Sequence, residues 1–331
     1  MKKFFCSLIF FFILFNGFSF SVNPFDFSEK TPVLYFEPLA GYSYGTIFEY
    51  VYATDKNTGS VEKLSELDWD LTNAYFFGGK LGVSYSFFDF SLYAKGYIPV
   101  PSGIMQDSDW QNKEDWSMKT NYSISENYLN DAFSLETDFF VSALKNSWFN
   151  LRGSLSLEYQ YYSFSAVNAY GWYGDSDSSS DHQSHYWYDT EAKEYKKGDL
   201  CGIDYQFSRS LIWLGLDFTF TPFWLNLNAG VKVPVLSYFT DIDFHASPGG
   251  GTYYYDQTIS SFSAVFQYYN IIFDINENFS LRMGYEYMYS LFCIGLDSVK
   301  HTDSYEEYSD SFGGNAASVM NWTLSAIFKL K

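Results

Sequence analysis

Long apolar runs, cysteine and basic residues are all scarce in this chain. After the N-terminal stretch, no apolar run approaches the roughly 20 residues that a membrane-spanning helix needs, which argues against a helical membrane protein. Three cysteines are too few for a fold built on disulfides. Lys and Arg number 20 against 39 Asp and Glu, so the surface repels nucleic acid and attracts cations or basic peptides. No G-x-S-x-G context occurs, which argues against a serine hydrolase.

Aromatic residues, in contrast, are abundant. They make up 23% of the chain, with 31 Tyr, 35 Phe and 9 Trp. Mean hydropathy is nevertheless slightly negative, at −0.18. A sheet whose two faces meet different solvents can place this much aromatic surface without a long apolar run.

The N-terminus predicts export. Residues 1–3 are basic after the initial Met, residues 4–15 are apolar, and residues 17–21 offer small side chains for cleavage. This order is typical of a secretory signal peptide and is too short to span a membrane. We therefore expect a signal peptide over 1–21 and a single mature domain over 22–331, and the exact cleavage site stays open.

Cleavage there changes the charge and the cysteine count. Loss of Lys2 and Lys3 leaves 18 basic against 39 acidic residues, a net charge of about −21. Cys6 leaves with the signal, and Cys201 and Cys293 remain. An oxidising compartment would permit one bridge between them, but the sequence does not decide whether they pair.

Apolar and polar residues alternate with a period of two along most of the mature chain, which predicts strands. The run 67–83, for example, puts Leu67, Trp69 and Leu71 on the same apolar face as Phe77 and Leu81. Including three weaker runs, we count ten strands. They cover about 34–52, 67–83, 88–100, 131–144, 149–159, 212–220, 223–235, 252–276, 279–289 and 317–331.

The connections between these strands alternate in length. Short turns are expected near 86–87, 145–147, 221–222 and 276–278, and long polar loops over about 102–130, 171–202 and 299–316. Short turns at one end, long loops at the other and an apolar outer belt are typical of an outer-membrane β-barrel. We therefore predict an all-β, transmembrane, antiparallel barrel of ten strands. About ten strands enclose little more than their own side chains, which argues against an open channel.

Several runs are longer than a membrane requires. A spanning strand needs about 9 to 11 residues, and some runs approach twice that length, so we expect the barrel to extend above the membrane on the extracellular side. The stretch 174–181, GDSDSSSD, lies in one of the long loops. Its Asp spacing hints at calcium, but the twelve-position loop with its closing Glu is missing, which favours a solvated loop.

The segment YFTDIDFH, residues 238–245, carries an acid/base set. Asp241, Asp243 and His245 are two residues apart, so on a strand they leave the same face. Counted from Val235, that face would point outward. We predict that the strand shifts phase, with a β-bulge near Pro234, and that these side chains point inward.

A second acidic pair lies in the segment IMQDSDWQ. If the phase of the preceding strand continues past Pro99 and Pro101, Asp107 and Asp109 both point inward. The same counting places Glu49 on the inward face of the first strand. The remaining histidines, His182, His185 and His301, fall in polar loops and are expected at the surface.

Taken together, these motifs resemble the omptin family of outer-membrane endoproteases. The resemblance rests on the signal peptide, the predicted barrel and four short motifs in order between about Leu34 and Phe328. These motifs are KLSELDW (63–69), the Asp107/Asp109 pair followed by Trp110, YSFSA (162–166) and the Asp243-x-His245 pair.

The resemblance implies a groove at the extracellular mouth of the barrel, with the Asp107/Asp109 pair facing the Asp243–His245 pair across a water. It also implies that Glu49 and Asp241 line an acidic pocket for a basic side chain, so cleavage is expected next to Arg or Lys. The chemistry is consistent, because His is a suitable general base near neutral pH. Two neighbouring carboxyls can share a proton and donate it. No cofactor or metal is expected.

Partners follow from the same resemblance. We expect basic peptides or proteins as substrates, outer-membrane lipid around the barrel, no nucleic acid, and a monomer. Members of the family bind lipopolysaccharide through outward basic residues, yet segment 159–164 looks shortened here and no Lys or Arg occurs from Ala246 to Ser280. These departures argue against a dependence on lipopolysaccharide, and the sequence leaves open whether it or another lipid is needed for activity. The chain ends in Lys331, with Phe328 the nearest aromatic residue.

Two other functions stay open at this point. A non-catalytic barrel, an adhesin or a basic-peptide-binding protein, would use the same groove without cutting. A metal site is the other, because several Asp and one His at a rim are able to hold a divalent cation. Neither the natural substrate nor the oligomeric state can be read from the sequence.

Overall fold

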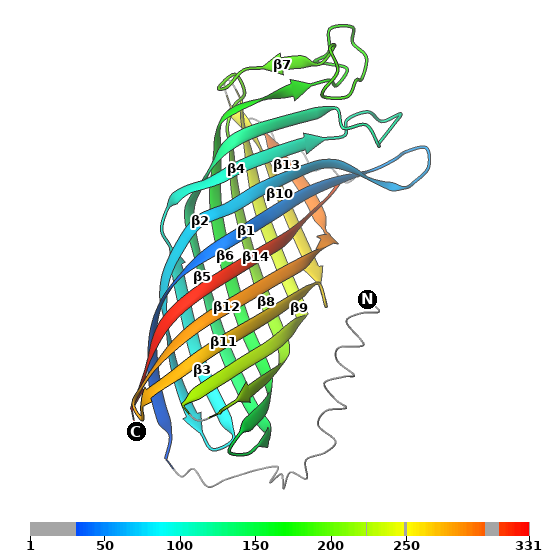
Figure 1. The fold of residues 1–331 in the computed structure, drawn as a ribbon. Helices are drawn as coiled ribbons and strands as arrows, with labels where there is room; N and C mark the ends of the chain where they lie inside the picture. The colour runs from blue at the N-terminus through cyan, green and yellow to red at the C-terminus, as the bar shows by residue number, and fades with distance from the viewer. Residues whose placement is uncertain (1–30, 223, 248–249, 302–310, 331) are drawn as a thin grey trace.

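The chain folds into a tall antiparallel β-barrel (Figure 1). The structure is a computed structural model and describes residues 31–222, 224–247, 250–301 and 311–330. The predicted signal peptide over 1–21 lies outside the described residues. Within the described residues no helix is long and apolar enough to cross a membrane. Cys201 and Cys293 are both free thiols.

The described residues form fourteen strand segments. These are β1 Val33–Thr54, β2 Val61–Tyr85, β3 Phe88–Tyr97, β4 Val100–Asp109, β5 Asn121–Lys145, β6 Phe149–Tyr173, β7 Lys193–Tyr195, β8 Ile203–Phe220, β9 Leu225–Ser247, β10 Gly250–Ser260, β11 Ala264–Asn276, β12 Phe279–Ile294, β13 Leu296–His301 and β14 Ser311–Leu330.

The predicted ten-stranded barrel is confirmed. Three pairs of segments, β3/β4, β10/β11 and β12/β13, are each one long strand with a short break, and β7 is a three-residue addition beside β6. The remaining seven strands complete the ring, which closes where β1 pairs with β14 and where β9 pairs with β11. Each neighbour is antiparallel, so the backbone of the described strands pairs within the barrel, as a membrane requires.

The short turns fall where the sequence predicts them, at 86–87, 146–148, 221–222 and 277–278. All of them lie at the end of the barrel where the C-terminus lies, and β7 lies at the opposite end (Figure 1). Three strands are 25 residues long, about twice what a membrane needs. The strands therefore extend well beyond the membrane on the side of β7.

An apolar belt surrounds the lower barrel. On seven strands besides β1, whose outward Leu34 is 53% exposed, a Leu or Met side chain points outward and is more than half exposed. Side chains this apolar are stable at such exposure because the surrounding medium is the hydrocarbon of a bilayer. The seven are Leu81, Leu92, Leu135, Leu157, Leu216, Met283 and Leu324.

The predicted loop over 102–130 is wrong. β4 occupies its first part and β5 begins at Asn121, so the loop between them covers only 110–120. At this level the inward face of β5 is polar, with Asn121, Ser123, Ser125 and Asn127 all buried, so the polar composition of the segment was mistaken for that of a loop. The loop over 171–202 contains the short strand β7. Of the loop expected over 299–316, residues 302–310 lie outside the described residues and the flanking parts are strand.

The prediction that the apolar residues of 67–83 share one face is wrong. Leu67, Trp69 and Leu71 point inward and are at most 2% exposed, whereas Phe77 and Leu81 point outward. The phase changes at Asn73, which has a φ of 55°. The register of β1 against β2 slips at the same level, between Ser43 and Gly45. Because Asn73 adopts a left-handed conformation, the side chains of β2 before it are exchanged between the inward and the outward face.

This inversion creates an aromatic layer inside the barrel. The ring of Trp69 stacks on that of Tyr205, with centroids 5.1 Å apart and an interplanar angle of 9°. Phe164 packs against the other side of the cluster, 5.7 Å from Trp69. Met105 and Phe239 belong to the same buried core. This layer adjoins the residues of the predicted active site, because Tyr205 pairs with Asp243 and Trp69 lies one inward position below Leu67, the partner of Asp107.

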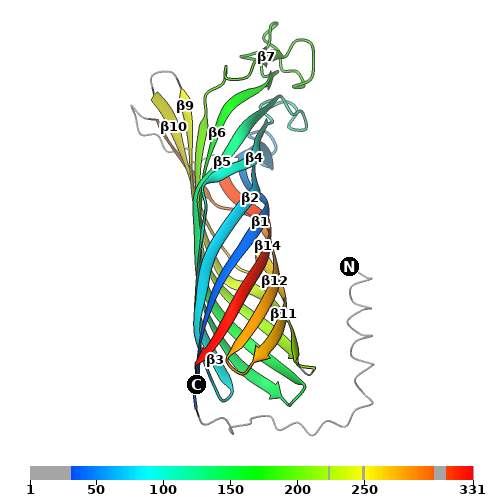
Figure 2. The same cartoon turned by 60° about the vertical axis from the view of Figure 1, so that its left-hand side comes forward.

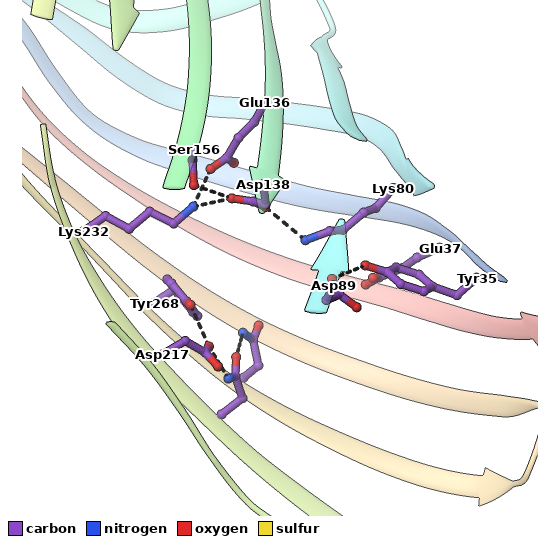
Figure 3. A network of polar contacts seen from close by, with 12 residues as sticks. Tyr35, Glu37, Lys80, Asp89, Glu136, Asp138, Ser156, Asp217, Lys232 and Tyr268 are labelled. Atoms are coloured by element: carbon purple, nitrogen blue, oxygen red, sulfur yellow. Dashed lines mark hydrogen bonds and ion pairs between the residues drawn. The ribbon is translucent and has the colours of Figure 1, made fainter. Parts of the chain in front are cut away.

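Below the aromatic layer the lumen is lined by charged residues that pair across it (Figure 3). Lys232 Nζ lies 2.6 Å from Glu136 Oε1 and 2.6 Å from Asp138 Oδ1. Lys80 Nζ lies 3.3 Å from Asp138 Oδ2, so one carboxylate binds two ammonium groups. Arg152 Nε lies 2.7 Å from Asp217 Oδ1. The Lys232 pairs join β9 to β5, three strands apart in the ring, whereas Arg152 and Asp217 lie opposite each other on neighbouring strands. All of these residues line a cavity of about 290 Å³.

Candidate active site

A β-bulge in β9 turns the acid/base set inward, as the sequence analysis predicts. In the pairing of β8 with β9, Ile212 lies opposite Leu236 and Trp213 lies opposite Pro234, which leaves Val235 as the extra residue. Pro has no N–H to offer a ladder, so this is a favourable place for a bulge. Beyond the bulge Asp241 and Asp243 are buried, at 3% and 2% exposure.

Asp107 and Asp109 reach the same level of the barrel from β4. The pairing of β4 with β2 places Asp107 opposite Leu67 and Asp109 opposite Ser65. In β3 the odd-numbered residues point inward, but this alternation does not continue unchanged into β4. Ser102, an even-numbered residue, is buried, and the register slips between Pro101 and Ile104. Gly103, with a φ of 85°, lies at that slip. Two phase changes cancel, and Asp107 is 9% exposed.

The upper ends of the strands that carry these residues form opposite walls. In Figure 2, β9 and β10 rise on one side of the barrel and β2 and β4 rise on the other. Segments 134 residues apart in the sequence therefore contribute to one site. Asp107 and Asp109 lie within electrostatic reach of His245, since both help to raise its pKa after the larger effects of burial and Asp243.

The Asp243–His245 pair is joined by a hydrogen bond between His245 Nε2 and Asp243 Oδ2. The imidazole packs edge-on against Tyr254, with centroids 5.1 Å apart. Its side chain is 36% exposed while that of Asp243 is 3% exposed. The carboxylate is thus fixed in the wall, and the ring it orients is open to a substrate.

The surroundings of His245 favour its protonated form. Withdrawal from water by itself would lower its pKa, but the charge and hydrogen bond of Asp243 and the charges of Asp107 and Asp109 outweigh this. Together they raise the pKa of His245 to about 9. The imidazolium that forms when this ring accepts a proton is therefore strongly stabilised.

The two carboxyls of β4 favour their protonated forms. Burial and then the charge of Asp109 raise the pKa of Asp107 well above its ordinary value, although His245 acts in the opposite direction. Burial also raises the pKa of Asp109, against the hydrogen bond from Ser65. Asn121 Nδ2 donates to Asp109 Oδ2 at 3.4 Å. Two like charges this close hold a proton between them more readily than either alone.

Glu49 and Asp241, the two residues expected in an acidic pocket, are both buried and both inward. Tyr205 OH and Asn315 Nδ2 donate to Asp241 Oδ2, at 3.2 Å and 3.3 Å. Burial raises the pKa of Asp241 to about 7, with Asp243 adding to the shift. Burial and then the charges of Asp243 and Asp241 raise the pKa of Glu49 well above its ordinary value. Glu49 Oε2 has no hydrogen-bond partner among the residues that the structure describes.

Sequence reasoning missed the residues that hold these carboxyls in place. These residues are Asn121 on β5, Tyr205 on β8 and Asn315 on β14. Each is one of many polar residues on an alternating strand, and each reaches its carboxyl partner only because distant segments pair. Asp256 on β10 was also missed. It is the only charged residue between Ala246 and Phe273, and this isolation is the signal that would have singled it out.

The other candidate residues lie away from this site. His185 Nε2 lies 2.8 Å from Asp181 Oδ1 in the loop after β6, and His182 in the same loop is exposed. The side chain of His301 lies outside the described residues. In the part of the chain that the structure describes, no three His, Cys, Asp or Glu side chains are grouped as a metal site requires.

The chain is similar to known proteins in sequence and in structure. The model of the Omptin family matches residues 39–331. The crystal structure of the outer-membrane protease OmpT from Escherichia coli matches with a TM-score of 0.77 and 17% sequence identity, over 94% of this chain and 99% of that chain. The translocator domain of the autotransporter NalP from Neisseria meningitidis matches with a TM-score of 0.35 and 8% identity, over 92% and 90%. No curated protein sequence matches significantly. At 17% identity, the OmpT comparison shows a shared fold.

Proposed function

The chain belongs to the Omptin family, and on that premise we propose that it is an outer-membrane endopeptidase that cuts next to Arg or Lys. The observation that supports the proposal is that Asp107 on β4 and the hydrogen-bonded Asp243–His245 pair on β9 point into the same end of the barrel from opposite walls. Together with Asp109, these groups supply a base, an acid and a polar cradle for one water. The side of the barrel that bears β7 faces the exterior of the cell.

In the proposed reaction, His245 acts as the general base. Asp243 accepts the hydrogen bond from Nε2–H, so the lone pair of Nδ1 takes a proton from a water bound between the two walls. The oxygen of that water forms a bond to the carbonyl carbon of the peptide. Asp243 stabilises the resulting imidazolium without taking the proton itself.

The Asp107/Asp109 pair completes the reaction. One carboxyl of the pair carries a proton, which it shares with the carbonyl oxygen as negative charge develops there. The C–N bond then breaks, and the leaving amine takes a proton from the imidazolium or from the carboxyl pair. The products are a carboxylic acid and an amine, and one water is consumed.

Specificity follows from the acidic pocket. Glu49 and Asp241 are buried carboxyls beside the dyad, and the described contacts of the pocket include no Lys or Arg side chain that neutralises them. A basic side chain entering this pocket would ionise both groups and satisfy the free oxygen of Glu49. The charged substrate therefore brings with it the partner that these buried groups lack.

A matched pair of peptides tests the proposal. The refolded protein is incubated with two fluorogenic peptides that are identical except that one has Arg and the other has citrulline, its neutral isostere. We expect kcat/KM to be at least about thirtyfold higher for the Arg peptide, since an unpaired buried carboxylate costs 2 kcal/mol or more. Mass spectrometry of the products locates the bond. Equal cleavage of both peptides would contradict the specificity, and no cleavage of either would contradict the endopeptidase.

Activity should rise with pH into the alkaline range. kcat/KM reports the free enzyme, where His245 must be neutral to act as a base, and its pKa is raised to about 9. We expect kcat/KM to increase roughly tenfold per pH unit from pH 7 towards 9. In Asp243→Asn the increase should begin at lower pH, because the group that raises the pKa of His245 most has lost its charge. A profile flat between pH 6 and 9 would rule out His245 as the base.

A further inference from the structure

Asp256 lies beside the acidic pocket and takes no part in the proposed reaction. In the register of β10 against β9 it is directly opposite Asp241, and directly opposed residues on antiparallel strands point to the same face. Asp256 is 5% exposed and points inward. A Cβ atom at Gly313 on β14 would overlap its carboxylate, so the glycine leaves the space that the carboxylate occupies.

The three carboxyls of Glu49, Asp241 and Asp256 act on one another. Asp256 and Asp241 both raise the pKa of Glu49, and burial and then Asp241 raise the pKa of Asp256 well above its ordinary value. Asn315 links the walls, because it donates to Asp241 and lies opposite Glu49 in the register of β1 with β14. The three carboxyls therefore belong to one pocket.

Four buried oxygens of this pocket find no donor among the described residues, although Tyr205 and Asn315 donate to Asp241. The four are Glu49 Oε2, Asp256 Oδ1, Asp243 Oδ1 and Asn315 Oδ1. Every one of these atoms is an acceptor. A buried acceptor without a donor costs free energy, so the group that belongs here brings several donors and a positive charge.

Two basic side chains have that charge, and they differ in their donors. A guanidinium is planar and offers five N–H donors in a fixed fork, whereas an ammonium offers three on a compact, strongly hydrated centre. Acceptors that reach one pocket from β1, β9, β10 and β14 are spread around the ligand, and the fork of a guanidinium reaches more of them at once than an ammonium does.

We propose that Asp256 is a third carboxylate of the substrate pocket and that it makes the pocket select Arg over Lys. The inference rests on the proposed function and deepens it. Glu49 and Asp241 supply the charge that either basic side chain needs. Asp256 supplies the additional acceptor that a guanidinium uses and an ammonium does not reach.

The test compares Asp256→Asn with Asp204→Asn. Asp204 is an exposed carboxylate on the outer face of β8, so its substitution changes the net charge by the same amount away from the pocket. Wild type should favour an Arg peptide over the matching Lys peptide by about tenfold or more in kcat/KM. Asp256→Asn should lose about ten- to a hundredfold on the Arg peptide, the usual effect of removing a hydrogen bond to a charged group. It should lose much less on the Lys peptide, and Asp204→Asn should match wild type.

A binding measurement separates this inference from the proposed function. Affinities for the Arg and Lys peptides are measured in the His245→Ala background with and without Asp256→Asn, and urea unfolding confirms that each variant is folded. Tighter binding of the Arg peptide that disappears with Asp256→Asn supports the pocket even if wild type cuts no peptide. An Arg-to-Lys ratio that is unchanged in Asp256→Asn, in cleavage and in binding, would overturn it.

Discussion

His245→Ala should lower kcat on an Arg-containing peptide by about a thousandfold or more while the peptide still binds. General-base catalysis contributes about 10² to 10⁴ in rate, and here the same ring also accepts the charge that Asp243 stabilises. The acidic pocket is built from other residues, so KM should change little. Initial rates with the fluorogenic peptide and a binding titration measure the two quantities separately.

The control for this variant is His185→Ala. His185 lies in the loop after β6 and pairs with Asp181, so the same substitution there should leave kcat unchanged. Asp107→Asn should resemble His245→Ala, because it removes the proton donor from the opposite wall. If His245→Ala and wild type cut the peptide equally, the dyad is not the catalytic unit. If wild type binds the peptide and yields no product, the barrel is a binding protein.

The part of this site that was predictable is the part that depends on local periodicity. The spacing of Asp241, Asp243 and His245 fixes them to one face of a strand whatever the rest of the barrel does. Their conflict with the phase of Val235 was enough to predict the bulge that β9 contains. A conflict between two local patterns is therefore informative in itself.

The parts that were not predictable depend on a single backbone angle or on distant pairing. Nothing in the alternation of 67–83 shows that Asn73 adopts a positive φ. That backbone angle is nevertheless the reason why the side chain of Trp69 points into the lumen. Tyr205 and Asn315 join Asp241 only because β8 and β14 are placed around β9. The inward position of Asp107 was predicted correctly from an argument that was incomplete, since two phase changes cancel before it.

Replacing Lys232 by Met should lower the free energy of unfolding by about 3–5 kcal/mol, the usual effect of removing one partner from a buried ion pair. The side chain of Lys232 is 4% exposed and binds both Glu136 and Asp138. Without it, the neighbouring inward carboxylates Glu136 and Asp138 of β5 lose their shared cation, and among the described ion pairs Lys80 binds only Asp138. Urea unfolding of the refolded barrel, followed by tryptophan fluorescence, measures the change.

The matched control is Lys197→Met, which removes an ion pair with Glu126 whose side chains are 59% and 42% exposed. Exposed pairs contribute little, so this variant should unfold at the same urea concentration as wild type. An equal loss in both variants would show that the lumen network is not what stabilises the barrel.

Peptide cleavage distinguishes the roles further. The aromatic layer around Trp69 and Tyr205 lies between Lys232 and the dyad, so Lys232→Met should keep its kcat/KM under conditions where it remains folded. Stability and catalysis then depend on different levels of one barrel.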